Sequence, residues 1–238
     1  GVGAVALVGV VLFVLARVRH RRRLVRAVLG EAERTIVELA ENVDRGQLRE
    51  TRGIAYLDDT DTVHRTAEQP LVEDLDDLPF PARDLYDYDA FRAAGGWEFG
   101  MLSSRGCPFR CTFCQPTLNM IFGRMRKRGP MNVAQEMAQL QERYNPPILY
   151  FKDDTLSANG LKWFAEFQQA LDDLGVSQQW KCNTRVDKVG PRILDAMAAA
   201  GCQEVVFGVE SGSQRILDFY QKDIQQVFWK VCLIKNLL

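Results

Sequence analysis

Three cysteines, Cys107, Cys111 and Cys114, lie within eight residues of one another in the string SSRGCPFRCTFC. Three residues separate the first two thiols and two separate the last two, so one loop can bring all three to a cuboidal 4Fe–4S cluster. Three thiolates occupy three of the four irons. The fourth iron stays open to a substrate, unlike the irons of a ferredoxin cluster held by four cysteines. The motif therefore predicts a cluster that takes part in chemistry.

A structural zinc site is the alternative for these thiols, and it would need a fourth protein ligand. The two histidines, His20 and His64, are far away in the sequence, and Cys182 would have to fold back to reach the site. Cys182, Cys202 and Cys232 are scattered through apolar stretches, which is typical of buried thiols and not of a disulfide framework. The cysteine usage therefore favours the cluster and a reducing, cytoplasmic compartment.

Polar side chains follow the strands that the sequence predicts beyond the cysteines. They are Asp153 and Asp154 after 148–152, Arg185 after 179–184, and Glu210 and Ser211 after 204–209. Because active sites of parallel α/β barrels lie at the C-terminal ends of the strands, we expect these side chains to share one site with the cysteines. The structural alternatives are helix caps or turns for the acids and the serine, and an ion pair for the arginine.

The elements that must position these residues alternate between strand and helix after residue 95. Strands are predicted at 97–103, 148–152, 179–184 and 204–209, and helices at 131–144, 160–174, 191–200 and from about 213. Alternation of this kind is typical of parallel βαβ units. The expected fold class is therefore α/β, with four units that make half of an eight-fold barrel or two-thirds of a six-fold one.

The cysteine string, with Phe113 just before its last cysteine, resembles the radical S-adenosylmethionine (SAM) superfamily. The strings FKDDTL, GVESGSQ, LVEDLDDLPFPARDL and GEAERTIVEL resemble its cobalamin-binding-domain subfamily, which includes methyltransferases and the anaerobic magnesium-protoporphyrin ester cyclase. The resemblance covers about residues 31–225. It implies a partial (β/α) radical SAM TIM-type barrel that follows an N-terminal helical and linker remnant of a cobalamin-type domain.

The resemblance implies an enzyme that cleaves SAM reductively at the 4Fe–4S cluster and so starts radical chemistry, methyl transfer or ring formation, on a small organic substrate. It also implies a reduced flavodoxin or ferredoxin-like electron donor, and cobalamin in the full-length parent. Two rivals are a cobalamin-independent radical SAM enzyme, methylthiotransferase-like or an oxidoreductase, and a non-catalytic fragment that only binds a cluster.

The same resemblance implies SAM contacts for the polar residues. One of the two adjacent aspartates is expected to accept hydrogen bonds from the SAM ammonium group. Arg185 is expected to pair with the SAM carboxylate or with Asp154. Glu210 and Ser211 are expected to contact the ribose or the carboxylate, and Phe113 to pack beside the adenine or to shield the cluster from water.

The first 16 residues carry no charge, and arginines follow them at once, beginning with Arg17. This pattern predicts a short membrane helix with membrane contact through 1–18, or a strand and helix left from a domain whose front is missing. A helix is predicted at 31–45 and a hairpin at 53–61, before an acidic, proline-containing linker at 68–89. The expected domains are therefore 1–30, 31–90 and 91–238, and the chain is expected to lack parts that its relatives have at both ends.

The formal net charge of −1 gives no indication of a nucleic-acid partner. The basic run of Arg124, Arg126, Lys127 and Arg128 predicts a solvated face. A docking patch for an acidic electron donor is the alternative for the same run.

Overall fold

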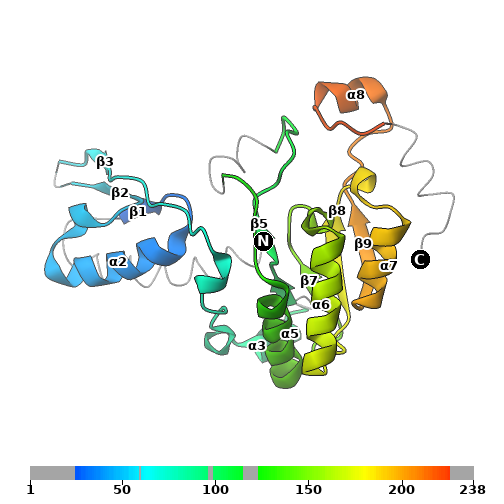
Figure 1. The fold of residues 1–238 in the computed structure, drawn as a ribbon. Helices are drawn as coiled ribbons and strands as arrows, with labels where there is room; N and C mark the ends of the chain where they lie inside the picture. The colour runs from blue at the N-terminus through cyan, green and yellow to red at the C-terminus, as the bar shows by residue number, and fades with distance from the viewer. Residues whose placement is uncertain (1–24, 59, 96–98, 115–122, 226–238) are drawn as a thin grey trace. The chain divides into compact units, whose positions relative to one another are not determined.

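The computed structural model describes residues 25–58, 60–95, 99–114 and 123–225. The chain divides into two compact units, Gly1–Glu73 with Met120–Gly123, and Asp74–Asn119 with Arg124–Leu238 (Figure 1). The apolar run at 1–16, His20 and Cys232 lie outside the described residues. Within the described ranges, no helix has the length and apolar character that a membrane crossing requires.

The first unit is a three-stranded antiparallel sheet with one long helix. The strands are β1 (Val25–Val28), β2 (Ile54–Leu57) and β3 (Val63–Arg65) in that order, and the helix is α2 (Ala32–Arg45). Leu39 of α2 is buried in a cluster with Ile54 and Tyr56, and Gly46 ends the helix in the left-handed conformation that suits glycine. The predicted helix and hairpin are confirmed. Strand β1 was not predicted, because it lies in the arginine-rich segment.

The second unit contains the parallel sheet that the alternating pattern predicts. Its order is β4 (Phe99–Met101), β7 (Leu149–Phe151), β8 (Trp180–Thr184) and β9 (Cys202–Phe207). The helices are α3 (Tyr88–Ala93), α5 (Pro130–Tyr144), α6 (Leu161–Leu174), α7 (Pro191–Ala199) and α8 (Gln214–Phe219), and a two-stranded ribbon joins β5 (Ser104–Arg105) to β6 (Arg126–Lys127). All three pairings within the four-stranded sheet are parallel, so the predicted α/β class is confirmed.

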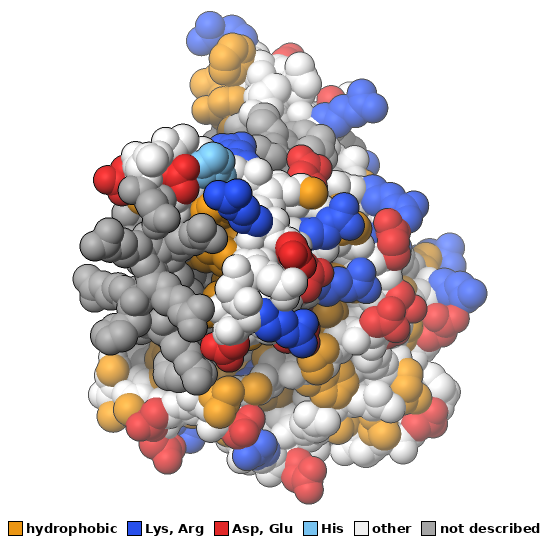
Figure 2. All heavy atoms as spheres, turned by 90° about the vertical axis from the view of Figure 1, so that its left-hand side faces the viewer, with side chains coloured by type: hydrophobic (Ala, Val, Ile, Leu, Met, Phe, Trp, Pro, Cys, Tyr) orange, Lys and Arg blue, Asp and Glu red, His pale blue; other side chains and the backbone are white. Residues whose placement is uncertain are grey.

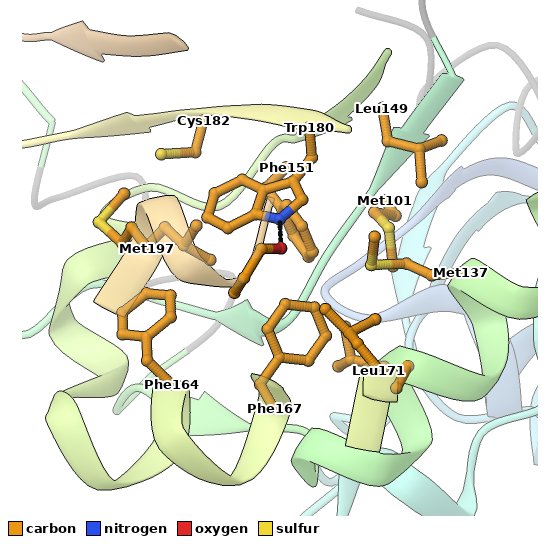
Figure 3. Packing of buried hydrophobic residues seen from close by; sticks show 14 of the residues in the cluster. Met101, Met137, Leu149, Phe151, Phe164, Phe167, Leu171, Trp180, Cys182 and Met197 are labelled. Carbon is orange, nitrogen blue, oxygen red and sulfur yellow. Dashed lines mark hydrogen bonds between the residues drawn. The ribbon is translucent and has the colours of Figure 1, made fainter. Parts of the chain in front are cut away.

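One face of this sheet forms the core with the helices that cover it (Figure 3). Phe151 of β7 and Trp180 of β8 are fully buried and meet edge to face, with ring centroids 5.1 Å apart. Phe164 and Phe167 of α6 point at them from below, and the indole N–H of Trp180 donates to the carbonyl of Ala200 at 2.6 Å. Alternate residues of the strands thus anchor the sheet, and the strand ends are held in fixed positions.

The division between the two units falls between Glu73 and Asp74, earlier in the chain than the boundary that the sequence places near residue 90. The later part of the linker packs on the second unit. The carboxylate of Asp76 accepts from the backbone N–H of Gly129 at 2.9 Å, and Tyr88 stacks on Phe99 with centroids 4.3 Å apart. Such contacts join residues far apart in the sequence, so the composition of the linker alone could not show them.

The expected solvated face of the basic run is wrong for two of its arginines. Arg126 lies in β6 and is buried, and the guanidinium of Arg128 forms an ion pair with the buried carboxylate of Glu136. Elsewhere, Figure 2 shows acidic and basic side chains interspersed on the face that it draws, in keeping with the formal net charge of −1.

Candidate functional site

The cysteine loop follows β5 and is fixed at both ends. Gly106 begins it with a φ of +81°, and a Cβ at this position would lie 3.2 Å from the carbonyl oxygen of Arg124. Glycine therefore suits both the backbone conformation and the close approach of the chain just before β6. At the far end, the backbone N–H of Thr112 donates to the carbonyl of Tyr220, just after α8, at 2.9 Å. The loop is thus held between the β5–β6 ribbon and the end of α8.

All three cysteines of the loop line one pocket of about 240 Å³, called the cysteine pocket below. The rest of its wall comes from Phe109 and Phe113 of the same loop, from the C-terminal ends of three parallel strands and from a lysine beyond α8. The residues at the strand ends and beyond α8 are Asp154 and Thr155 after β7, Asn183, Thr184 and Arg185 at the end of β8, Val206, Phe207, Gly208 and Glu210 at the end of β9, and Lys222. The structure thus brings most of the strand-end residues and the three cysteines to one place.

Each of the three thiols has a distinct environment. The Sγ atom of Cys107 lies 3.6 Å from the hydroxyl of Thr155, and that of Cys111 accepts a hydrogen bond from Arg185 at 3.3 Å. Burial raises the pKa of the Cys114 thiol, and the charge of Asp154 and the other two cysteines raise it further. The thiolate form of Cys114 is therefore disfavoured unless a cationic centre lies beside it.

Three thiols from one loop that line one pocket are a donor set that a 4Fe–4S cluster can use. No group of three His, Cys, Asp or Glu side chains in the described part of the chain is arranged to hold one metal ion. A cuboidal cluster places no such demand, because each of three thiolates binds a different iron. The wall of the pocket also contains the apolar residues Phe109, Phe113 and Val206.

The two adjacent aspartates after β7 have different surroundings. Asp153 is fully buried, and its carboxylate accepts from the backbone N–H of Ser103 at 3.1 Å and from the hydroxyls of Ser103 and Ser104 at 2.7 and 2.5 Å. Burial raises its pKa, although these hydrogen bonds act in the opposite direction. Asp154 lines the cysteine pocket, and partial burial raises the pKa of its carboxyl group. Asp153 thus fixes the chain before the cysteine loop, and only Asp154 faces the site.

Arg185 lines the pocket, and its ion pair matches the structural alternative and not the pairing with Asp154. Its guanidinium pairs with Asp187 instead, with Nε–Oδ1 and Nη2–Oδ2 distances of 2.9 and 3.1 Å. The short helical turn Val186–Lys188 brings Asp187 back beside the arginine two residues earlier. Sequence reasoning missed this local partner, because it considered only acids at other strand ends.

The two residues after β9 also separate. Glu210 has a φ of +65° and lines the pocket, where one carboxylate oxygen lies 2.8 Å from the ammonium nitrogen of Lys222. Ser211 is not among the lining residues, and its hydroxyl accepts from the backbone N–H of Ser213 at 3.1 Å. The contacts of Ser211 match its structural alternative, a turn before the next helix.

Phe113 lines the pocket and is half exposed, with its ring meeting that of Tyr220 edge to face at 5.2 Å. Lys222, which the sequence analysis did not select, is buried and lies 5.5 Å from the centre of the same ring. Lys222 follows a helix, whereas the sequence analysis selected only residues that follow predicted strands. Its nearness to Glu210, twelve residues earlier, depends on the turn that α8 makes.

Comparison with known proteins shows what this chain is similar to. The model of the radical SAM superfamily matches residues 101–233. The chain is 35% identical over 201 residues to an uncharacterised methyltransferase of Pyrococcus horikoshii, covering 83% of this chain and 42% of that protein. It is 28% identical to cytidylyl-2-hydroxyethylphosphonate methyltransferase of Streptomyces wedmorensis, covering 79% and 41% of the two chains. It is 29% identical to the anaerobic magnesium-protoporphyrin IX monomethyl ester cyclase of Rubrivivax gelatinosus, covering 88% and 39%. The chain therefore spans about two-fifths of the length of these curated relatives.

Two solved structures share the fold. One is the cobalamin-dependent SAM radical enzyme OxsB with aqua-cobalamin and SAM bound, with a TM-score of 0.67, 20% identity, and coverage of 84% of this chain and 30% of that one. The other is the radical SAM methyltransferase TsrM of Kitasatospora setae with tryptophan and a SAM analogue, with a TM-score of 0.66, 18% identity, and coverage of 82% and 39%. The expected partial (β/α) barrel is therefore confirmed.

Proposed function

We propose that this chain, which belongs to the radical SAM superfamily, binds a 4Fe–4S cluster through Cys107, Cys111 and Cys114 and cleaves SAM reductively to start radical chemistry on an organic substrate. The observation that carries the proposal is the convergence of the three thiols on one pocket at the ends of parallel strands. When bound, the cluster supplies the single electron that breaks the sulfonium bond of SAM and releases a 5′-deoxyadenosyl radical.

Under this proposal, different residues of the pocket bind different groups of SAM. Asp154 would accept hydrogen bonds from the SAM ammonium group, which a carboxylate at the edge of the site can do strongly. Lys222 would pair with the SAM carboxylate, and Glu210 would hold the lysine in place and accept from the ribose hydroxyls. Phe113 would cover the adenine or the cluster. Arg185 is left out of this set, because Asp187 already pairs with its guanidinium.

We also propose that the parent protein is a cobalamin-type methyltransferase or cyclase. The relatives named above carry those activities in their names, and both solved neighbours are radical SAM enzymes of related kinds. Under this proposal, residues 31–73 form the end of the cobalamin-type domain. Within them, the Glu31 carboxylate accepts from the backbone N–H of Val72 at 3.1 Å and so joins the helix to the linker. Bound cobalamin in the visible spectrum of the parent would separate this assignment from a cobalamin-independent one.

Radical SAM enzymes act on small substrates and need a reductant. We propose a reduced flavodoxin or ferredoxin-like protein as the donor, and a cytoplasmic location, because the described cysteines are all free thiols. A donor of this kind should reduce the reconstituted protein in place of dithionite.

The proposal is tested by anaerobic reconstitution with iron and sulfide. The wild-type chain should take up roughly four irons and produce 5′-deoxyadenosine from SAM on reduction. Cys107→Ala, Cys111→Ala and Cys114→Ala should each lose most of the iron and all of the product. Cys182→Ala is the matched control, because its thiol is buried in the core and does not line the pocket. A stable zinc site, or loss of iron in the Cys182 variant alone, would overturn the ligand assignment.

A further inference from the structure

Arg185 donates a hydrogen bond to one of the three cysteine sulfurs. Its Nη1 atom lies 3.3 Å from the Sγ atom of Cys111, and the arginine side chain is 5% exposed. The contact joins the exit of β8 to the middle of the cysteine loop. It is therefore a long-range contact at the site itself.

The guanidinium of Arg185 contacts groups from three segments of the chain, which restrict its movement. Asp187 takes two of its N–H groups, and the carbonyl of Lys222 accepts another. The ring of Phe109, two residues before Cys111, lies 4.1 Å from the guanidinium carbon. An arginine fixed in this way keeps one N–H directed at the sulfur and has little freedom to turn toward a ligand.

A fixed cation beside a cluster ligand affects the redox equilibrium of the cluster. Reduction adds one negative charge, part of which resides on the ligand sulfurs, and hydrogen bonds to those sulfurs raise the reduction potential. The effect is large where water is excluded, because charges interact more strongly in a medium of low dielectric constant. Both the hydrogen bond to the sulfur and the exclusion of water are present at Cys111, because Cys111 is 8% exposed and Arg185, counted as a whole residue, is 4% exposed.

We propose that Arg185 is a positioning residue that fixes Cys111 and raises the reduction potential of the cluster, so that a biological donor can deliver the electron for SAM cleavage. This assignment rests on the proposed function, since it concerns the same cluster. It replaces a role in binding the SAM carboxylate. Asp187 then has the opposite electrostatic effect, because its negative charge lies against the same guanidinium.

The test is an EPR-monitored redox titration of the reconstituted full chain, without SAM, in four variants. In Arg185→Gln the reduced-to-oxidised ratio at a fixed potential should fall about tenfold, which is a shift of ~59 mV for one electron. The midpoint potential of Arg185→Lys should lie between those of the wild type and Arg185→Gln, because lysine keeps the positive charge but loses the planar set of N–H donors of the guanidinium. Asp187→Asn should shift the midpoint to a more positive value, since the isosteric amide keeps an acceptor and removes the negative charge.

Arg128→Gln is the matched control. Arg128 also pairs with a buried carboxylate and lies over an aromatic ring, that of Phe80 at 5.4 Å, but it does not line the pocket. Its midpoint should equal that of the wild type. Shifts of the same sign in Arg185→Gln and Asp187→Asn, or no shift in either, would overturn the assignment and indicate a purely structural arginine.

The outcomes also separate this assignment from the proposed function. If the wild-type chain takes up no cluster, the proposed function and this role fall together. If the cluster forms and its potential is the same in all variants, only the role of Arg185 falls. If Arg185→Gln alone assembles no cluster, the Arg185→Lys and Asp187→Asn midpoints decide the question.

Discussion

Strands β8 and β9 are neighbours in the sheet and both end at the cysteine pocket, yet they are held very differently. In β8, Trp180, Cys182 and Thr184 are buried, and the hydroxyl of Thr184 meets that of Ser157 at 2.6 Å. In β9 no residue is buried, and Val206 is 41% exposed. The pocket therefore has one wall on a strand with buried residues and one on a strand whose residues are all partly or fully exposed. Mutations on the two strands should separate effects on stability from effects on ligand binding.

The largest difference between the strands should appear in the free energy of unfolding. Trp180→Ala removes a fully buried ring and its hydrogen bond to the Ala200 carbonyl, and should cost about 3–5 kcal/mol. Val206→Ala on the exposed strand should change the free energy by less than about 0.5 kcal/mol. Urea unfolding followed by far-UV circular dichroism measures both. Equal losses would show that β9 is as well anchored as β8.

A second prediction concerns the two aspartates that follow β7, Asp153 and Asp154. Asp154→Asn should weaken SAM binding about ten- to a hundredfold, because one charge-assisted hydrogen bond is lost, and should leave the unfolding free energy nearly unchanged. Calorimetric titration of the reconstituted protein with SAM gives the affinity. Asp153→Ala should instead destabilise the fold, since three donors from Ser103 and Ser104 lose their acceptor. A loss of SAM affinity without loss of stability in Asp153→Ala would reverse the two roles.

The wall formed by β9 should give a smaller effect on SAM. Glu210→Gln removes the charge that faces Lys222, and the carboxylate is one-third exposed, so the loss in SAM affinity should be less than about tenfold. Lys222→Met should have the larger effect of the two, because it removes the group proposed to bind the SAM carboxylate. The same titration measures both variants. A larger loss in Glu210→Gln than in Lys222→Met would contradict the proposed division of roles.

The smallest expected effect is a pH dependence from the buried Asp153. Because burial raises its pKa in the folded chain above the ordinary value of 3.8, the folded state holds its proton to higher pH than the unfolded chain does. This contribution to stability is complete below pH 3.8 and is lost as the pH rises through the folded pKa. The stability of Asp153→Asn relative to the wild type should therefore increase with pH. Denaturant unfolding at a series of pH values checks the sign, and a decrease would mean that the hydrogen bonds outweigh burial.

Much of this site could be predicted from the sequence because its signals are local. The spacing of Cys107, Cys111 and Cys114 is local, and so is the position of Asp154, Arg185 and Glu210 directly after alternating strands. The register of the parallel sheet then brings those strand ends together. The local sequence pattern and the geometry of parallel sheets were together enough to predict most of the residues that line the pocket.

Apart from the local pairing of Arg185 with Asp187, the errors have a common physical cause, which is that they depend on contacts between distant residues. Arg83 of the linker forms an ion pair with Glu136 of α5, 53 residues later in the chain, with an N–O distance of 2.5 Å. This contact attaches the later part of the linker to the second unit. Arg128 pairs with the same glutamate, so the basic run is not simply a solvated face. Lys222 reaches the pocket only because α8 turns the chain back toward it. The spacing of residues in the sequence does not predict contacts of this kind.

The most direct test of the account is the EPR spectrum of the reduced, reconstituted protein before and after addition of SAM. A cluster held by three cysteines has one iron without a protein ligand, so SAM should change the spectrum of the wild-type chain. Asp154→Asn should need more SAM to give the same change, and Cys107→Ala, Cys111→Ala and Cys114→Ala should give no cluster signal. A cluster signal that SAM leaves unchanged, in a protein with its full iron content, would contradict the central claim.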